Sequence, residues 1–507
     1  MTQYDAVIIG GGAAGLAAGL QLGRVRRSAL VIDSGAPRNA PATHLHSYLG
    51  RDGLAPQQLL ADGRAEVERY GGVVRSGQVV AVEGDGVSGF KVELADGGRV
   101  GGRRLIVATG ITDVLPDVPG LAEQWGRGVI HCPFCHGWEV RDQRIVVLDT
   151  TGLGAHQALL FRQLSDDVTL VVHDGPGPDE AAAADLADLG VVVVPGAATE
   201  LVTVGDSVAG LRLADGSVVA ADAVAVGARF GPNLDGLDGV AFTLVDHPSG
   251  LGQVVQVDAN GATNVAGVYA VGNLTDPSQQ LLQAAAQGSR TAGLMTLDLV
   301  HDDVARIRRS REDAASWDER YGERDGSMWS GAVNGSLIVE MSGAAPGCAL
   351  DVGCGEGADA IWLAARGWEV TAVDISAVAI ERAHRAGEQA GVDVDWRAVD
   401  LLAEPPAPRS YDLVSIQFPA LLRSAGDDAV QRVLDAVAPG GTLLAVFHDI
   451  SGHEHAAEHF AQYIDLDALV ALLPADFVVD VRESRERPNP PAGNPHIADV
   501  VLRAHRP

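Results

Sequence analysis

The sequence predicts an α/β protein of Rossmann-like units, in which short parallel strands alternate with helices. At two places, residues 5–15 and 348–357, an apolar strand leads into a glycine-rich turn and then into a helix. After each of these units the next strand ends in an aspartate, Asp33 or Asp374. Glycines at such turns let a ligand approach the backbone at the carboxyl end of a strand. Both units therefore predict ligand sites at strand ends.

Composition limits the classes of function. The 507 residues are 47% apolar and 21% charged, which suits about three globular domains of ~150 residues each. A net charge of −30 disfavours nucleic acid, because phosphates would be repelled. A strand begins at Tyr4 without the regions of a signal peptide, and no apolar run is long enough to span a membrane. We expect a cytoplasmic protein with no membrane and no nucleic-acid partner.

The first glycine turn has the spacing of a dinucleotide site. Gly10, Gly12 and Gly15 form a Gly-x-Gly-x-x-Gly pattern between a strand and a helix. The first glycine permits the tight turn, the second lets a pyrophosphate reach the backbone, and the third lets helix and strand pack closely. Asp33, at the end of the following strand, is placed to accept hydrogen bonds from a ribose.

Two of the four cysteines, Cys132 and Cys135, form a Cys-x-x-Cys that is followed by His136. In a cytosolic protein a lone Cys-x-x-Cys is typical of dithiol–disulfide chemistry, because the short loop holds the sulfurs at bonding distance and lowers the pKa of one thiol. A zinc site would need a second pair, and Cys348 and Cys354 lie apart in another glycine-rich context. We predict a redox centre and no metal site.

Two later turns indicate a flavin. One strand ends in Thr109 and Gly110, and another leads into Gly272 and Asn273. With these motifs residues 1–300 resemble the pyridine-nucleotide–disulfide oxidoreductases, and among them the low-molecular-weight thioredoxin reductases. The resemblance implies a homodimer that binds FAD. The residues that would hold FAD are Gly10, Gly12, Gly15, Asp33, Thr109, Gly110, Gly272 and Asn273. The family has an aspartate at the position of Asn273. An asparagine there can still form a hydrogen bond with a hydroxyl group.

The resemblance also implies an order of domains. The FAD-binding domain would consist of two segments, 1–115 and 240–300. A NAD(P)-type domain that carries the dithiol, 116–239, would be inserted between them. Residues 301–315 are then expected to be a linker, and 316–507 a further domain.

Roles at the dithiol follow from the same resemblance. Cys135 would lie against the flavin, and Cys132 would exchange with a small thiol or disulfide, or with a thioredoxin-like protein. His136 takes the place of the usual acidic residue. An imidazole with a pKa near ~6.5 can shuttle the thiol proton at neutral pH.

The turn expected to bind a nicotinamide nucleotide departs from the family. Gly152 and Gly154 are present, but the third glycine is missing and Asp149 lies beside the phosphate path. Asp174 stands where NADPH-dependent relatives carry arginines, and an aspartate suits a free ribose hydroxyl and repels a phosphate. NADH, NADPH and no nicotinamide therefore stay open.

The direction of electron flow is open as well. A Cys-x-x-Cys-His subgroup of this fold acts as dithiol oxidases, which close disulfides in sulfur-containing metabolites and return electrons to dioxygen. The segment from Cys132 to His136 resembles theirs. A non-enzymatic alternative is an FAD-binding redox sensor, which the proton donor beside the cysteines disfavours.

The second glycine turn belongs to a different kind of site. It places an acid and three glycines after one strand and acids after the next two strands: Asp351, Gly353, Gly355, Gly357, Asp374 and Asp400. This series resembles the class I S-adenosylmethionine-dependent methyltransferases across roughly 310–507. The resemblance implies that the turn surrounds the methionine end of the donor, Asp374 binds the ribose and Asp400 binds the adenine amine.

The methyl acceptor is expected to be a small molecule. Residues after two later strands should face it: Gln417, Phe418, Pro419, His448, His453 and His455. We interpret the histidines as an acceptor-side base or a metal-ion patch. Trp317, Tyr321 and Trp329 resemble an N-terminal lid.

The sequence thus predicts an α/β fold with a two-domain FAD/NAD(P)-type oxidoreductase followed by a class I methyltransferase domain. The expected protein is a bifunctional enzyme, a thioredoxin reductase-like thiol–disulfide oxidoreductase with a methyltransferase. The covalent fusion motivates the hypothesis that both halves act on one class of small thiol, one closing disulfides and the other methylating thiols.

Overall fold

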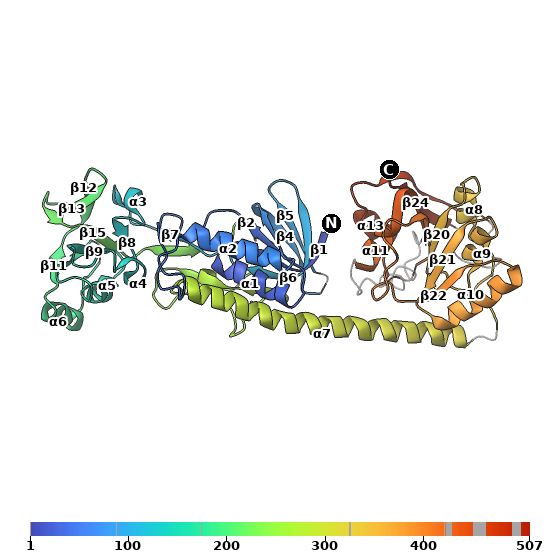
Figure 1. Cartoon of the computed structure of the whole chain (residues 1–507), viewed down its shortest axis with the longest axis horizontal. Coiled ribbons are helices and arrows are strands. Elements are labelled where there is room, and N and C mark those ends of the chain that lie inside the picture. The colour runs from blue at the N-terminus through green and yellow to red at the C-terminus, as the bar shows by residue number, and fades with distance from the viewer. Residues whose placement is uncertain are drawn as a thin grey trace. The chain divides into compact units, whose positions relative to one another are not determined.

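The structure is a computed structural model that describes residues 2–87, 89–173, 175–323, 326–419, 421, 428–449, 463–488 and 498–507. The chain divides into two compact units, Thr2–Leu299 and Val300–Pro507 (Figure 1). Asp174, His453 and His455, which the sequence analysis interpreted, lie outside the described residues.

The first unit begins with a mixed sheet. Its strand order is β3-β2-β1-β6-β5-β4, and β19 pairs with β6. Strands β3, β2, β1, β6 and β19 run parallel to one another, whereas β5 runs antiparallel to both of its neighbours, β6 and β4. The elements of this domain are β1 (Thr2–Ile9), α1 (Ala13–Arg24), β2 (Ala29–Asp33), α2 (Pro56–Arg69), β3 (Val73–Ser76), β4 (Val79–Asp85), β5 (Gly89–Leu94), β6 (Arg99–Val107), β17 (Leu244–Asp246), β18 (Gln253–Val255), β19 (Val268–Ala270), the 3₁₀ helix η1 (Gly272–Leu274) and α7 (Leu281–Gly322).

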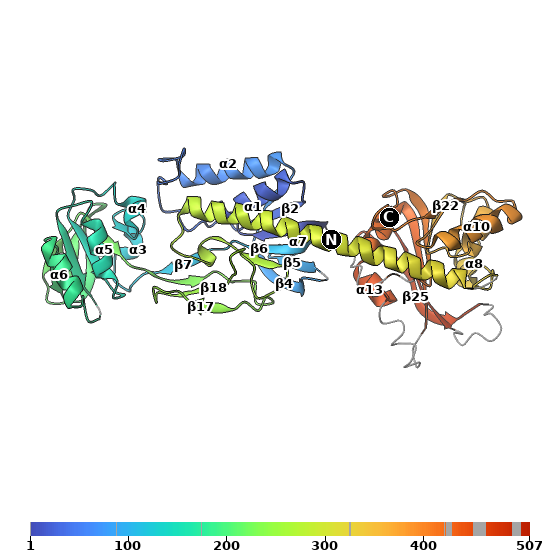
Figure 2. The same ribbon diagram turned by 90° about the horizontal axis from the view of Figure 1, so that it is seen from below.

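Alternation along β1 explains why both faces of this sheet are covered. Ala6 and Ile8 pack against α1, α2 and the first half of α7, which lie together on one face (Figure 2). Val7 and Ile9 point to the other face, where they pack with β4, β5 and residues around Leu237. A strand buried on both faces reads as a continuous apolar run, as β1 does.

The inserted domain has its own parallel sheet, with strand order β11-β10-β9-β15-β8. Helices α5 and α6 pack on one face of it, and the antiparallel sheet β12-β13-β14 packs on the other. Its elements are α3 (Leu121–Gln124), β8 (Val129–Ile130), α4 (Pro133–His136), β9 (Ile145–Asp149), α5 (Gly154–Phe161), β10 (Val168–Val172), α6 (Glu180–Asp188), β11 (Val192–Pro195), β12 (Ala198–Val204), β13 (Ser207–Leu213), β14 (Val218–Ala220) and β15 (Ala223–Val226).

Two antiparallel strands join the two domains of this unit. The outgoing strand β7 (Ile111–Val114) pairs with the returning strand β16 (Arg229–Pro232). After the return, Leu237 is already buried in the core of the first sheet. The chain therefore rejoins the first domain a few residues before position 240, the boundary that the sequence suggested.

The second unit is built on one sheet with strand order β22-β21-β20-β23-β24-β26-β25. Its strands are parallel except at β26, which runs antiparallel to both neighbours. The elements are α8 (Gly335–Met341), β20 (Cys348–Val352), α9 (Ala358–Ala364), β21 (Glu369–Asp374), α10 (Ala377–Ala390), β22 (Asp395–Ala398), β23 (Tyr411–Gln417), α11 (Asp428–Ala436), β24 (Val437–His448), α13 (Leu466–Ala471), β25 (Val478–Glu486) and β26 (Ala498–His505).

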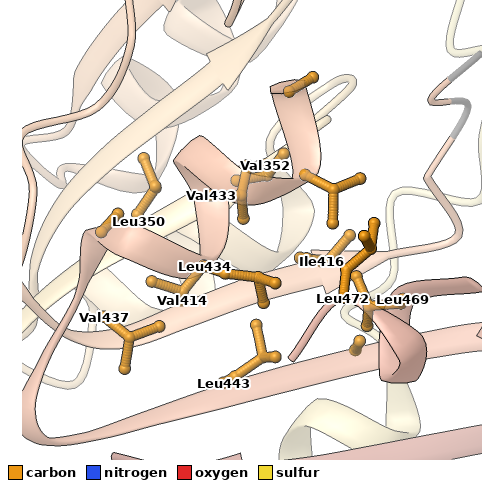
Figure 3. Close-up of a cluster of buried hydrophobic side chains, with 14 of the residues drawn as sticks. Leu350, Val352, Val414, Ile416, Val433, Leu434, Val437, Leu443, Leu469 and Leu472 are labelled. Carbon is orange, nitrogen blue, oxygen red and sulfur yellow. The ribbon is translucent and has the colours of Figure 1, made fainter. Parts of the chain in front are cut away.

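Aliphatic side chains fill both faces of this sheet. On one face Leu350 and Val414 pack with Val433 and Leu434 of α11 and with Leu469 of α13 (Figure 3). On the other face α8 and α9 cover the same strands. The carboxyl ends of β20, β21 and β23 meet at one edge of the sheet, as parallel strands require, and that edge carries the predicted methyl-donor residues.

The segment predicted as a linker is helical. Residues 301–315 lie within α7 and belong to the second unit. Ser310 donates a hydrogen bond of 2.5 Å to Asp400 of that unit. Among the described residues no helix is both long and apolar enough to cross a membrane.

Candidate functional sites

The turn after β1 has the geometry of a dinucleotide cradle. Gly10 has a φ of 114°, in the region that favours glycine. A Cβ on Gly15 would lie 1.9 Å from the Gly10 carbonyl oxygen, so only glycine allows α1 to begin so close to the turn. The space around Gly12, the N-cap of α1, is open and no side chain caps the helix. The first helical N–H groups can therefore bind a phosphate.

Replacing Gly15 by alanine should damage this cradle. The added Cβ would force the Gly10 turn and α1 apart, so we expect loss of bound flavin and a free energy of unfolding lower by about 1–3 kcal/mol. The ratio of visible to ultraviolet absorbance and thermal unfolding measure the two effects. Gly231→Ala is the matched control, since nothing lies within 4 Å of its Cβ. Full flavin content in Gly15→Ala would contradict the assignment.

Asp33 lies at the end of β2, where the sequence placed it, but it has partners of its own. One carboxylate oxygen accepts a 2.5 Å bond from Arg64, and the other accepts the backbone N–H of Gly35 at 2.9 Å. A ribose hydroxyl would join these donors on the same carboxylate.

The two later turns lie close to the cradle and are tied to other segments. Thr109 donates to the backbone oxygen of Asn233 at 2.6 Å, and Gly110 has a φ of 73°. A Cβ on Gly272 would lie 3.1 Å from the Cβ of Ala14 in α1. These contacts place both turns at the carboxyl edge of the first sheet.

The side chain of Asn273 closes its own loop. Its amide nitrogen donates to the backbone oxygens of Asp276, Pro277 and Gln279 at 2.9–3.3 Å. Its amide oxygen can only accept. The buried side-chain oxygen of Gln279 has no hydrogen-bond partner among the described residues. An open glycine cradle and unsatisfied acceptors fit a ligand with hydroxyl groups, so these residues fit FAD.

The dithiol lies at the start of the short helix α4. Cys132 is its N-cap, and its backbone oxygen accepts the N–H groups of Cys135 and His136 at 3.2 and 3.1 Å. Both cysteines are free thiols and partly exposed. Two large apolar side chains flank the cysteines, Phe134 between them in the sequence and Trp138 after them. Both are largely exposed, at 62% and 66%. The dithiol is therefore accessible and has an apolar rim.

The two thiols differ in acidity. A hydrogen bond from the Cys135 thiol lowers the pKa of Cys132 to about 7, against the opposing effect of burial and with help from backbone N–H groups and Arg38. The bond that it donates and its burial raise the pKa of Cys135. Cys132 is thus the thiolate of the pair near neutral pH, which makes it the more reactive sulfur.

His136 adjoins the dithiol as an uncharged imidazole at neutral pH. Burial lowers its pKa, and the nearby carboxylate of Glu139 opposes this only in part. Glu139 also lies 3.4 Å from His46, which belongs to the loop after β2. The hydroxyl of Ser47 in that loop donates to the backbone oxygen of Phe134 at 3.4 Å. The dithiol segment thus contacts the first domain, and a neutral imidazole there can accept a thiol proton.

The turn after β9 does not fit a nicotinamide nucleotide. Asp149 is only 3% exposed, and its carboxylate accepts the backbone N–H groups of Thr151 and Gly152 at 3.1 and 2.8 Å. These N–H groups belong to the turn before α5, where a pyrophosphate would be expected to lie. Gly154 has no room for a Cβ because Asp149 lies against it. A buried carboxylate therefore lies beside the expected phosphate path and would repel a pyrophosphate there.

The second unit contains one large cavity of about 1530 Å³. All six residues predicted to bind the methyl donor line it: Asp351, Gly353, Gly355, Gly357, Asp374 and Asp400. The glycines have φ values of 52–85°, and the space beside Gly353 is open. One oxygen of Asp351 is buried without a hydrogen-bond partner among the described residues. The residues present fit S-adenosylmethionine.

The two aspartates predicted for the nucleoside are oriented by backbone donors. Asp374 accepts the N–H groups of Gly355 and Ser376, each at 2.9 Å. Asp400 accepts the N–H of Leu402 at 2.8 Å, and Ser310 of α7 bonds its other oxygen. Fixed carboxylates of this kind can accept hydrogen bonds from hydroxyls and an amine.

Three acids cluster at this end of the cavity. Burial raises the pKa of Asp351 well above its ordinary value, and the carboxylates of Asp359 and Asp374 add to that effect. Burial likewise raises the pKa of Asp374 and brings that of Asp359 to about 6. A ligand with a sulfonium and an ammonium group would stabilise the charged form of these acids.

The predicted aromatic lid lies over the glycine turn. The Trp329 indole donates to the Tyr321 hydroxyl at 2.9 Å, and that hydroxyl lies 3.1 Å from the position of a Cβ on Gly355. Glu356 fastens the segment by accepting the backbone N–H groups of Met328 and Trp329. Arg382 adds a 2.9 Å bond to Glu356.

Sequence reasoning missed several residues of this site. It gave no role to Glu356 or Arg382 of the lid, to Ser310 of α7 or to Arg487 of the acceptor side. Glu356 could have been found, since it lies inside the glycine motif. The others come from distant segments and had no local signal. Among the described residues no group of three or more side chains could hold a metal ion. His453 and His455 lie outside the described residues, so the metal-ion patch suggested for the histidines stays a prediction.

Comparison with known proteins identifies the same two kinds of domain. Residues 4–289 match the family "Pyridine nucleotide-disulphide oxidoreductase", and residues 349–441 match the family "Methyltransferase domain". The thioredoxin reductases sirT of Leptosphaeria maculans and tcpT of Claviceps purpurea are each 39% identical to this chain, over 181 and 174 residues. These matches cover 34% and 33% of this chain, and 51% and 54% of the relatives. The chain thus matches about half the length of these curated relatives.

Solved structures are similar over nearly their whole length. The crystal structure of HlmI is 40% identical with a TM-score of 0.58, and the match covers 62% of this chain and 99% of that one. An oxidoreductase from Agrobacterium tumefaciens is 32% identical with a TM-score of 0.55, covering 59% and 99%. The flavin-type part of this chain therefore has the architecture of these proteins.

Proposed function

The chain belongs to the pyridine nucleotide-disulphide oxidoreductase family and carries a methyltransferase domain, and from this premise we propose that it oxidises and methylates small thiols. The first unit would be an FAD-dependent dithiol oxidase. The second would transfer a methyl group from S-adenosylmethionine to a thiol.

One observation carries the direction of electron flow. The carboxylate of Asp149 accepts the N–H groups of Thr151 and Gly152, and it thereby places a buried acid in the turn that would face the pyrophosphate of a nicotinamide nucleotide. Without that nucleotide, electrons enter from the dithiol side and leave to another acceptor. The exposed rim of Phe134 and Trp138 suits a small, partly apolar dithiol.

The low pKa of Cys132 makes it the better leaving group in the second step of disulfide exchange. A substrate thiolate first attacks the sulfur of Cys132 in the oxidised enzyme, and the sulfur of Cys135 leaves and takes up a proton, in keeping with its raised pKa. The second substrate thiol then attacks the substrate sulfur of this mixed disulfide, which closes the substrate disulfide and leaves both cysteines reduced. The neutral imidazole of His136 accepts a proton from a thiol in this sequence.

FAD, when bound, would accept the electron pair of the reduced cysteines and pass it to dioxygen, which becomes hydrogen peroxide. Binding the cofactor and positioning the dithiol beside it are functions of the residues of the chain. The Gly10 turn would bind the pyrophosphate, and the loop that contains His46 and Ser47 contacts the dithiol segment beside it.

In the second unit S-adenosylmethionine would supply an electrophilic methyl group. Asp374 would bind the ribose and Asp400 the adenine amine, as the fixed positions of their carboxylates allow. The site mainly aligns donor and acceptor, so proximity supplies much of the rate.

Anaerobic bleaching of the flavin tests the direction of electron flow. We expect a small dithiol such as dithiothreitol to bleach the flavin absorbance, and NADH or NADPH to leave it unchanged. Admission of oxygen should restore the colour and form about one equivalent of hydrogen peroxide per dithiol oxidised.

Rapid bleaching by NADPH would contradict the proposal and would instead support the thioredoxin reductase activity that the names of the curated relatives suggest. Bleaching by neither kind of reductant would contradict both.

A further inference from the structure

The second half of α7 forms one wall of the donor cavity. Residues 300–322 of this helix belong to the second unit. Their cavity-lining side chains recur every three or four residues, so one face of the helix is turned to the cavity. The residues of this face that matter below are Ser310, Asp313, Trp317, Arg320 and Tyr321.

This wall reaches both predicted ends of the methyl donor. Ser310 donates to Asp400, the residue predicted to bind the adenine amine. The hydroxyl of Tyr321 lies 3.1 Å from the position of a Cβ on Gly355, in the turn predicted for the methionine end. At a rise of about 1.5 Å per residue, positions 310 and 321 lie about 16 Å apart along the helix axis. The helix therefore runs along the length of the donor site.

Asp313 lies at the adenine end of this wall. It follows Ser310 by one turn on the same face, where neighbouring Cβ atoms are about 5–6 Å apart, and Ser310 is itself bonded to Asp400. The electrostatics agree with this position. Burial raises the pKa of Asp313, and the carboxylates of Asp400 and then Asp374 raise it further. Asp313 is thus a neighbour of the two acids predicted for the nucleoside.

The carboxylate of Asp313 has no donor from the protein. In the part of the chain that the structure describes, it has neither a hydrogen bond nor an ion pair. Arg320 is the cation that acts on it, but the guanidinium of Arg320 stacks on the ring of Trp317 at 4.4 Å. A half-buried carboxylate that lines a cavity without a donor suits a ligand that brings an N–H or O–H group.

An adenine amine suits a pair of carboxylates. The amine carries two hydrogens, and each carboxylate can accept one of them. A 6-oxo purine presents an acceptor oxygen at the same place. That oxygen would face two negative charges and would receive no hydrogen bond from them, so a site of this kind rejects it.

We propose that Asp313 binds the adenine amine of the methyl donor together with Asp400, and that Ser310 is the positioning residue that holds Asp400 in place. The proposal rests on the proposed use of S-adenosylmethionine. The two carboxylates select a 6-amino purine over a 6-oxo purine. A methyltransferase domain that began at residue 316, as the sequence suggested, would lack both Ser310 and Asp313.

Two product analogues that differ only at this group test the proposal. The full chain is titrated in a calorimeter with S-adenosylhomocysteine and with S-inosylhomocysteine, in which an oxo group replaces the amine. The ratio of their dissociation constants is the preference for the amine. We expect the wild-type chain to prefer S-adenosylhomocysteine by about 10²- to 10⁴-fold.

Asp313→Asn is the decisive variant. The preference should fall about 10- to 100-fold, because the variant loses a hydrogen bond to a charged acceptor and its amide can donate to the oxo group. Asp313→Ala should give the same loss, and alanine is the best helix former, so it excludes an effect of asparagine on the helix. Glu312→Gln is the matched control. Glu312 is the preceding, exposed acid of α7 and is not among the residues that line the cavity.

The positioning role of Ser310 has its own variants. Ser310→Ala should lower the preference about 2- to 10-fold, the scale of one neutral hydrogen bond, and Ser310→Thr should restore it because threonine keeps the hydroxyl. An unchanged preference in Asp313→Asn and Asp313→Ala would overturn the inference, whether both compounds bind more weakly or neither does. Failure of the wild-type chain to bind S-adenosylhomocysteine would instead count against the proposed methyltransferase activity.

Discussion

Replacing Cys132 by serine is expected to abolish disulfide formation by the full chain. Cys132 is the sulfur with the lowered pKa, and the exchange mechanism needs it as the atom that substrate attacks. Serine cannot form the mixed disulfide, so dithiol oxidation should fall by a factor on the order of 10⁴ to 10⁶, the scale seen when a covalent nucleophile is removed. Oxygen uptake with a small dithiol measures the loss.

Cys348→Ser is the matched control, because Cys348 belongs to the second unit and lies far from the dithiol in the sequence. It should keep full oxidation, and Cys132→Ser should keep its flavin colour. Unchanged oxygen uptake in Cys132→Ser would remove the exchange mechanism.

The pH dependence of alkylation checks the acidity of the same sulfur. A lowered pKa means that the thiolate is present above about pH 7 and is lost as the pH falls below it. Iodoacetamide should therefore modify Cys132 with a midpoint near that value. In Cys135→Ala the hydrogen bond from the neighbouring thiol is removed, so the midpoint should rise.

Replacing Asp374 by asparagine is expected to weaken donor binding about 10- to 100-fold. Hydrogen bonds to a charged group each contribute about 1.5–3 kcal/mol, and asparagine keeps the size but removes the charge. Its amide nitrogen also cannot accept the N–H of Gly355. Calorimetric titration with S-adenosylhomocysteine gives the dissociation constant.

Asp395→Asn is the control for this variant, since Asp395 is a half-exposed residue paired with Arg397. It should bind S-adenosylhomocysteine normally. Dithiol oxidation should be unchanged in both variants, because both aspartates belong to the other unit. Normal donor binding by Asp374→Asn would show that the ribose is held elsewhere.

Local signals in the sequence were sufficient to predict the binding turns. The cradle at Gly10, Gly12 and Gly15 depends on backbone angles and close contacts that only glycine permits, and these requirements are visible as a spacing. The acids that follow the next strands are equally local. In the second unit, all six residues that this reasoning predicted to bind the methyl donor line one cavity.

Partners from distant segments could not be predicted in the same way. The segment 301–315 read as a polar linker, yet it is helical and Ser310 reaches Asp400. His448 read as a base, and only the folded structure shows that its Nδ1 atom accepts a hydrogen bond of 2.8 Å from Arg487. No periodicity or spacing encodes such pairs, because they depend on how strands far apart in the chain meet at one edge of a sheet.

By itself the sequence determined the two Rossmann-like folds, the dithiol and the glycine turns, since each follows from residues that are neighbours in the chain. Tertiary structure decided which hydrogen-bonding groups remain for a ligand. At Asp149 the sequence indicated an acid beside the phosphate path, but only the folded turn shows its carboxylate bonded to the N–H groups of Thr151 and Gly152. A site is defined by the donors and acceptors that folding leaves unsatisfied, and that balance exists only once the chain is packed.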